Sequence, residues 1–573
     1  MPKSDTGTSP EKALSIGRRQ VLKGTALMVG TGTVGAAPAM AFGADASCAP
    51  ANTKVVARAN TAVVEIATGK IAGYIGRGIY AFKGIPYAAT TAGENRFMPP
   101  RKPTPWAGVR SSRQYGLVCP QDKGTGRLHD EEAFIFQWND SVEGEDCLRI
   151  NVWTPGINDT GKRPVMVWLH GGGFSAGSGN DIPAFDGENL ARKGDVVVVT
   201  LNHRLNLLGY MDLSKYGEKY APSGNAGMTD IVAALEWVRD NIAVFGGDPG
   251  RILIFGQSGG GAKVSTLMGM PSAKGLFHRA VVESGSFSFY NTPDKSQRLA
   301  ELMLTELGLT ASTVDRIQTI PYATLQAASV SVLRKANAEP ANILNLRSMA
   351  SRLDFTPVVD GKILPSTPFN PVAPDITADV PMIIGTTLNE FANGINQPDF
   401  DLMTEADLKS RIEASHPGRA EQVIAAFRER TPKARPADLY SRIMSAPVRQ
   451  AAIKQAAAKA ALNKAPAYLY WFTRQTPIFD GRPGAFHCAE IPFVFGNTDS
   501  CAHMTGGGDD ARALSDKMLH TWVQFARTGD PHHRGIPHWP AFSPMRVPTM
   551  VWDDSIGVVL NPDGEEQKAA SAI

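Results

Sequence analysis

The five residues Gly256-Gln257-Ser258-Gly259-Gly260 carry the clearest chemical signal in this sequence. A serine with small residues two positions before and after it is typical of a nucleophile elbow, a sharp turn whose strained backbone leaves no room for neighbouring Cβ atoms. Residues 251–255 before it are apolar and β-branched, and residues 262–268 after it can form a helix. The pattern predicts that Ser258 is a nucleophile; the alternative is a glycine-rich turn with an idle serine.

A second glycine run follows another apolar strand candidate. His170-Gly171-Gly172-Gly173-Phe174 comes directly after residues 165–169, and its glycines leave backbone N–H groups uncovered. Serine attack on an ester needs such donors, because the carbonyl oxygen becomes negatively charged in the tetrahedral intermediate. We therefore expect the N–H groups of Gly172, Gly173 and Gly259 to form an oxyanion hole.

The elements that position these residues are strands alternating with helices. Residues 60–85 predict antiparallel hairpin strands, and residues 295–350 and 404–464 predict helices inserted over the strand ends as a lid. The alternation predicts an α/β fold with a doubly wound, mostly parallel sheet. The buried-strand candidates are residues 150–153, 165–169, 196–200, 252–255, 280–283, 381–385 and 467–471, and further helices are expected at 229–241 and 516–526.

Composition narrows the class of protein. The 573 residues are 43% hydrophobic and 20% charged, as in a globular protein with a large core. A net charge of +3, spread along the chain, gives no reason to expect a nucleic-acid partner. No apolar run is long and clean enough to predict a mature transmembrane helix or a stable membrane anchor, and the oligomeric state cannot be read from the sequence.

The N-terminus resembles a targeting segment. Residues 17–23 (GRRQVLK) form a twin-arginine region, a weakly apolar stretch of small residues follows, and Ala39-Met40-Ala41 or Ala44-Asp45-Ala46 offers a cleavage site. We predict a signal peptide over residues 1–46, export of the folded protein by the twin-arginine machinery of a bacterium, and a periplasmic or secreted single domain over residues 47–573. The alternative is a disordered basic tail.

Further motifs give the chain a family resemblance. Together with residues 255–260, they resemble the type-B carboxylesterase family, which includes the cholinesterases, over about residues 60–545. The resemblance implies an α/β-hydrolase fold, hydrolysis of small-molecule carboxylic esters by a serine nucleophile, and no metal or organic cofactor. The motifs are residues 82–87 (FKGIPY), 96–100 (RFMPP), 145–152 (EDCLRINV), 202–204 (NHR), 245–249 (FGGDP), 355–360 (FTPVVD) and 522–526 (WVQFA).

The resemblance also implies roles that spacing alone leaves open. Eight histidines follow Ser258, and the family pattern selects His487, before residues 492–496 (PFVFG), as the general base. It selects Glu390 as the acid that orients His487, and Ser284 as a residue supporting the triad. The alternatives are a surface carboxylate for Glu390 and a structural core histidine for His487. His532, His533 and His538 crowd a proline-rich loop and favour a solvated surface over a metal site.

Structural pairings are expected as well. Cys119 and Cys147 bracket a polar loop and are the preferred disulfide, worth about 3–4 kcal/mol; the resemblance supports this pair, and also ion pairs of Arg96 with Glu145 and Arg204 with Asp230. Cys488 and Cys501 could form a second bridge. Because twin-arginine cargo folds in a reducing cytoplasm, any bridge would have to form late.

The substrate is the least determined feature. Gln257 stands where the family commonly has glutamate, so the elbow keeps its shape but loses a charge. Trp138 lies near the position of the choline-binding tryptophan of cholinesterases, at a different distance from the cysteine. Phe174, Phe287 and Phe289 are candidate pocket residues, with ordinary core aromatics as the alternative. An amidase or carbamate hydrolase, a lipase, and a non-catalytic binding module of the same fold stay open.

Overall fold

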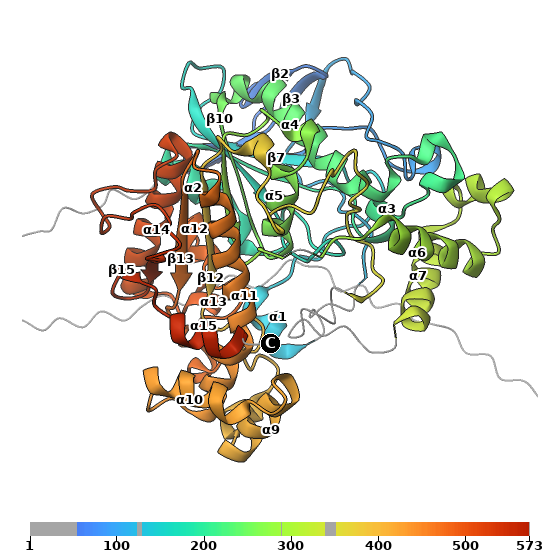
Figure 1. The fold of residues 1–573 in the computed structure, drawn as a ribbon. Coiled ribbons are helices and arrows are strands. Elements are labelled where there is room, and N and C mark those ends of the chain that lie inside the picture. The colour runs from blue at the N-terminus through green and yellow to red at the C-terminus, as the bar shows by residue number, and fades with distance from the viewer. Residues whose placement is uncertain (1–53, 123–128, 288, 338–350, 572–573) are drawn as a thin grey trace, which may run out of the picture. The chain divides into compact units, whose positions relative to one another are not determined.

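A twelve-stranded sheet forms the centre of the computed structural model, which describes residues 54–122, 129–287, 289–337 and 351–571 (Figure 1). The order along the sheet is β1-β4-β5-β7-β9-β8-β10-β11-β12-β13-β14-β15, and β2, β3 and β6 form a separate small sheet. The strands are β1 Val55–Val56, β2 Val63–Ile66, β3 Gly69–Ala72, β4 Tyr74–Gly76, β5 Ile79–Pro86, β6 Val109–Ser111, β7 Arg149–Thr154, β8 Arg163–Leu169, β9 Val197–Leu201, β10 Gly247–Gln257, β11 Arg279–Glu283, β12 Met382–Thr387, β13 Ala467–Phe472, β14 Pro548–Trp552 and β15 Gly557–Leu560.

The middle of the large sheet is parallel and its edges are antiparallel. Neighbouring strands from β9 through β8 and β10 to β14 all pair in parallel, whereas β1, β4, β5 and β7 and the final β15 pair antiparallel. Parallel neighbours require crossover connections, which the intervening helices supply. The predicted doubly wound, mostly parallel sheet and the hairpin strands in residues 60–85 are confirmed.

Alternate residues of each central strand enter different cores, because successive side chains of a strand point to opposite faces. In β8, Val165, Val167 and Leu169 belong to one hydrophobic cluster, while Met166 and Trp168 belong to another. Both faces of the sheet are therefore covered, which explains why the strands read as continuous apolar runs.

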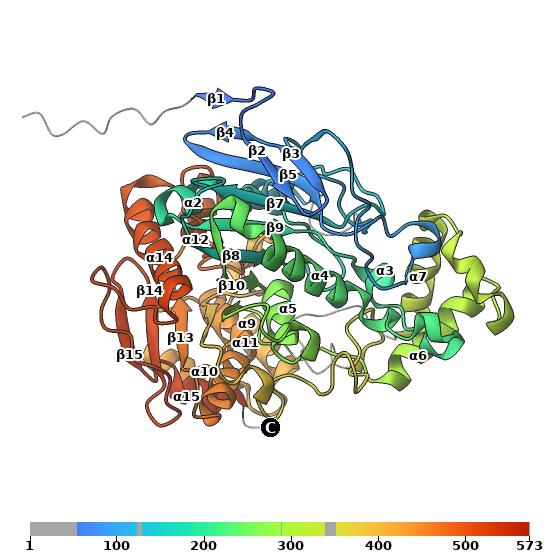
Figure 2. The same cartoon turned by 90° about the horizontal axis from the view of Figure 1, so that it is seen from above.

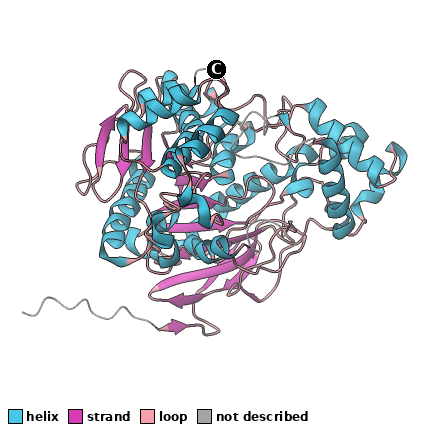
Figure 3. Cartoon of the chain, turned by 90° about the horizontal axis from the view of Figure 1, so that it is seen from below, coloured by secondary structure: helices cyan, strands magenta, loops and turns pink. Residues whose placement is uncertain are grey.

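Helices form layers on both faces of the sheet (Figures 2 and 3). On one face α4 and α5 lie against β10, and α11 lies against β12 and β13; on the other, α2 and α14 contact the sheet and α12 packs on α14. The helices are α1 Asp130–Phe136, α2 Glu188–Gly194, α3 Asn206–Tyr210, α4 Ala226–Asn241, α5 Gly259–Met268, α6 Pro293–Glu306, α7 Tyr322–Ala336, α9 Glu405–Ser415, α10 Ala420–Arg430, α11 Pro436–Ala461, α12 Ile491–Phe495, α13 Ala502–Thr505, α14 Gly508–Thr528 and α15 Gly564–Ser571.

The two inserted helical regions pack differently, since buried residues of α6 and α7 belong to the main core of the sheet. The helices α6 and α7 pack on each other, and α9, α10 and the start of α11 share a small hydrophobic core of their own. Strands β14 and β15 were not expected from the sequence; β14 extends the parallel sheet beyond β13. Within the described ranges, no helix has the length and apolar character to span a bilayer. The predicted export signal, residues 1–46, lies outside the described residues.

Candidate active site

Ser258 occupies a strained turn between β10 and α5. Its backbone has φ 57° and ψ −123°, a region that residues with a Cβ rarely adopt. The turn passes against the end of β8, where a Cβ on Gly256 would lie 2.6 Å from the carbonyl oxygen of Leu169 and one on Gly260 only 1.9 Å from it. Both elbow glycines are therefore required by close backbone contact, and Ser258 is held at the carboxyl end of the central strands.

The glycine run after β8 lies directly beside this turn. Gly172 and Gly173 have φ 82° and 61°, in the left-handed region that favours glycine. Among the described residues, the N–H groups of both have no protein acceptor, and the N–H of Gly259 is the first of α5, where no intrahelical acceptor exists. The structure thus gathers the three glycines predicted to form the oxyanion hole.

His487 and Glu390 are joined by a short hydrogen bond. Nδ1 of His487 lies 2.5 Å from Oε2 of Glu390. The other carboxylate oxygen of Glu390 accepts bonds from Ser284 Oγ at 2.8 Å and from the backbone N–H of Thr387 at 3.0 Å. Glu390 is 1% exposed, so the alternative of a surface carboxylate is excluded. Ser284 therefore supports the position of Glu390, as the family resemblance implied.

Gln257 lies between the elbow and the histidine. Its amide nitrogen is 3.1 Å from Nε2 of His487, and its amide oxygen accepts a bond from the thiol of Cys488 at 3.1 Å. Across the described ranges, no hydrogen bond joins Ser258 Oγ to His487; both residues instead line one cavity. The side chain of Gln257 thus contacts the imidazole of His487.

Two cavities meet at Ser258. The first, about 470 Å³, contains His487, Gln257 and the carboxylates of Glu132 and Asp181; the second, about 400 Å³, lies toward α5 and does not include His487. Phe391 lines both cavities, and its ring centroid is 4.1 Å from that of His487. Sequence reasoning missed Phe391, although its position next to Glu390 was an available signal.

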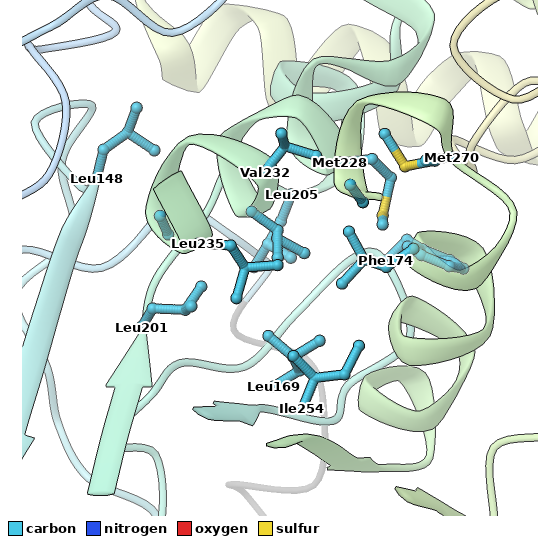
Figure 4. Packing of buried hydrophobic residues seen from close by; sticks show 14 of the residues in the cluster. Leu148, Leu169, Phe174, Leu201, Leu205, Met228, Val232, Leu235, Ile254 and Met270 are labelled. Carbon is cyan, nitrogen blue, oxygen red and sulfur yellow. The ribbon is translucent and has the colours of Figure 1, made fainter. Parts of the chain in front are cut away.

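The predicted aromatic pocket residues divide between the two cavities. Trp138 lines the first and stacks on Phe136 at 4.8 Å between ring centroids. Phe287 and Phe289 line the second and stack on each other at 5.4 Å. Phe174 borders the second cavity but is also part of the hydrophobic core that contains Leu169 and Ile254 (Figure 4).

A cluster of buried acids lies behind the Glu390–His487 pair. Glu283, the last residue of β11, accepts a bond from Trp522 Nε1 at 2.8 Å, and burial raises its pKa to about 8. Burial, with Glu283 and Glu390 as charged neighbours, also raises the pKa of Glu490 well above its ordinary value. Both groups are fully buried. Burial therefore disfavours the charged form of both carboxyls.

The two ion pairs implied by the family resemblance are confirmed. Arg96 contacts both carboxylate oxygens of Glu145, at 2.7 and 2.5 Å. Arg204 contacts both oxygens of the fully buried Asp230, at 2.8 and 2.6 Å. The described residues contain no group of three or more histidines, cysteines or acids placed to hold a metal ion.

Neither predicted disulfide is present in this structure. Cys119 and Cys147 are both free thiols. They are neighbours, and the hydrogen bond to Cys119, together with burial, raises the pKa of the Cys147 thiol well above its ordinary value. The sequence therefore located the pair correctly, whereas the predicted covalent bond is not formed in this structure.

Cys488 and Cys501 are also free thiols, so the second predicted bridge is wrong for this structure. The Cys488 thiol is directed to Gln257 in the first cavity, whereas Cys501 packs in a hydrophobic core with Met504.

The fold and this site define an α/β-hydrolase. Residues 60–559 match the model described as the carboxylesterase family, and the chain belongs to that family and is a carboxylic-ester hydrolase. It is 34% identical to a para-nitrobenzyl esterase of Bacillus subtilis over 88% of this chain and 98% of that protein, and 32% identical to a phenmedipham hydrolase of Pseudarthrobacter oxydans over 88% and 96%. Its structure is similar, with a TM-score of 0.78 and 37% identity, to an esterase from anaerobic Clostridium hathewayi described as able to hydrolyze aliphatic aromatic polyesters, over 90% of this chain and 99% of that chain.

Proposed function

We propose that this protein cleaves esters through an acyl-enzyme intermediate on Ser258. The observation that carries the proposal is the 2.5 Å hydrogen bond between Glu390 and His487. His487 lines the same cavity as Ser258. A buried carboxylate on Nδ1 fixes the imidazole tautomer and stabilises the imidazolium, so that Nε2 is the nitrogen that accepts the serine proton.

The reaction proceeds in two symmetrical halves. Ser258 Oγ attacks the ester carbonyl while His487 removes its proton, and the N–H groups of Gly172, Gly173 and Gly259 bind the resulting oxyanion. Collapse of the tetrahedral intermediate breaks the bond to the alcohol oxygen, which takes the proton from His487. Water then attacks the acyl-enzyme by the same route and releases the acid and free Ser258.

The two cavities assign the two parts of the ester. His487 must protonate the leaving alcohol, so the alcohol occupies the first cavity, which His487 lines, and the acyl group occupies the second. Phe287, Phe289 and Tyr290 make the acyl cavity aromatic. We therefore expect esters of bulky aromatic acids with polar alcohols to be good substrates; the polyester activity described for the Clostridium hathewayi esterase is consistent with an aromatic acyl group.

Replacing the nucleophile tests the mechanism. Ser258→Ala should lower kcat for a p-nitrophenyl ester by about 10⁶, and an organophosphate should label Ser258 covalently in the wild type. Activity of the variant within tenfold of the wild type would overturn the assignment.

A panel of esters that varies the acyl and alcohol groups independently tests the assignment of the cavities. Phe287→Ala should change the preference for the acyl group, and Trp138→Ala should change the preference for the alcohol group. The reverse pattern would contradict the assignment of the cavities.

A further inference from the structure

Lys263 is a fully buried lysine directly beneath residues 170–174, which form the oxyanion loop. It lies on α5, five residues after Ser258, and its side chain is 0% exposed. Its Nζ donates to the carbonyl oxygen of His170 at 2.9 Å and to that of Gly173 at 2.8 Å. Across the described ranges no carboxylate pairs with it. Burying an amine without a counter-ion costs free energy. The presence of Lys263 at this position therefore needs a structural or functional explanation.

The two carbonyls enclose the part of the loop that carries the oxyanion donors. The His170 carbonyl precedes the N–H groups of Gly172 and Gly173, and the Gly173 carbonyl follows them. A single ammonium or amine group therefore fixes both ends of the segment to the helix that begins at the nucleophile. Bond rotation within residues 171–173, which glycines permit freely, would otherwise turn these N–H groups away.

A second observation shows how closely the loop is held. A Cβ on Gly259 would lie 2.3 Å from the carbonyl oxygen of Gly173 and 2.4 Å from its nitrogen. These contacts are shorter than any real Cβ makes, so the first position of α5 tolerates only glycine while the loop keeps this position. The loop is thus bound to α5 from beneath by Lys263 and rests directly on Gly259.

We infer that Lys263 is a positioning residue for ester hydrolysis, which fixes the N–H groups of Gly172 and Gly173 toward the oxyanion by tying the loop to the nucleophile helix. The inference rests on the proposed function of Ser258. Lys263 acts through the backbone and does not line either cavity.

The chain supplies a matched control in Lys459 of α11. Its side chain is also buried, and its Nζ donates to the carbonyl oxygens of Thr377 and Ala378, both at 2.9 Å. Those residues precede β12, at the end of the sheet opposite the elbow. Lys459 therefore makes the same kind of hydrogen bonds to backbone carbonyls, but neither it nor the residues that it binds line the cavities at Ser258.

The test compares Lys263→Met with Lys459→Met in the full-length protein. Both variants should lose thermal stability. Lys263→Met should in addition lower kcat for a p-nitrophenyl ester by about 10²-fold, the typical cost of an oxyanion donor, with KM changed less than threefold. Its affinity for an aryl trifluoromethyl ketone, which forms a tetrahedral oxyanion on the serine, should fall by the same factor. Lys459→Met should keep kcat within threefold of the wild type.

Several results would overturn the inference. A kcat for Lys263→Met within threefold of the wild type, or an equal kcat loss in Lys459→Met, contradicts it. Gly259→Ala keeps the lysine and displaces the same loop, so unchanged kcat and ketone affinity in that variant would contradict it even if Lys263→Met failed to fold. If the wild type hydrolyses no ester, the proposed function itself fails; an active wild type with an equally active Lys263→Met overturns this inference alone.

Discussion

Two buried polar regions flank Ser258, and they satisfy their polar groups in different ways. Beneath the oxyanion loop, Lys263 directs its donors at two backbone carbonyls. Behind the histidine, the Glu390 carboxylate accepts three hydrogen bonds, whereas the Glu283 carboxyl accepts one from the described residues, that of Trp522. Burial raises the pKa of Glu283 to about 8 and lowers that of Lys263 to about 7. Hydrogen-bond partners, not burial alone, therefore distinguish Glu390 from its buried neighbour Glu283.

The sharpest test of this contrast replaces each of the two carboxyl groups, those of Glu390 and Glu283, by an amide. Glu390→Gln should lower kcat by about 10⁴, because an amide N–H facing Nδ1 favours the wrong histidine tautomer. Glu283→Gln should change kcat less than threefold, since its amide oxygen still accepts the Trp522 bond. Steady-state kinetics with one p-nitrophenyl ester measures both. Equal losses in the two variants would show that the acid cluster works as a unit and would remove the distinction.

The two regions should also give stability opposite dependences on pH. Between pH 4.5 and 8, folded Glu283 keeps a proton that the unfolded chain releases, so rising pH lowers the free energy of unfolding, by up to about 1.4 kcal/mol per unit. Between pH 7 and 10.5, the unfolded chain keeps a proton that folded Lys263 has lost, so rising pH increases that free energy.

Thermal unfolding midpoints across these ranges check the two signs. Glu283→Gln should reduce the decline of the midpoint with pH in the lower range. Lys263→Met should reduce the rise in the upper range. A Glu283→Gln protein whose midpoint declines as steeply as that of the wild type would show that Glu283 does not retain a proton.

Ser284 tests how many donors Glu390 needs. Ser284→Ala removes the 2.8 Å bond to Oε1 but leaves those from Thr387 and His487. We expect kcat to fall about tenfold, corresponding to roughly 1.4 kcal/mol for one bond to a charged group. Ser296→Ala is the matched control. Ser296 Oγ donates a 2.7 Å hydrogen bond to the buried carboxylate of Asp212, and neither residue lines the two cavities at Ser258. A similar loss of kcat in both variants would point to general destabilisation.

The smallest expected effect concerns Gln257. Gln257→Glu places a carboxylate beside the imidazole of His487 and favours its protonated form. The acid limb of the kcat/KM profile should therefore move to higher pH, by about one unit. A shift to lower pH, or an unchanged profile, would mean that the residue 257 side chain turns away from His487 during turnover.

Much of the site could be predicted because local sterics leave marks in the sequence. The glycines at 256 and 260 are required by the carbonyl of Leu169, and the strand runs around them are apolar because both faces of the sheet are buried. The sequence pattern of strands β14 and β15 was too weak to predict them. The predicted disulfides are not formed in this structure, because sequence spacing does not report whether thiols are oxidised. The export signal stays a prediction.

The sequence by itself determined the reaction class, through the elbow, the glycine run and the collinear family motifs. Only the tertiary structure decided that Gln257 contacts His487, that two cavities meet at Ser258, and that Lys263 binds the oxyanion loop. The physical reason is range. A strained turn is specified by its own residues. A buried lysine instead acquires its role from the carbonyls of His170 and Gly173, which lie 93 and 90 residues away along the chain.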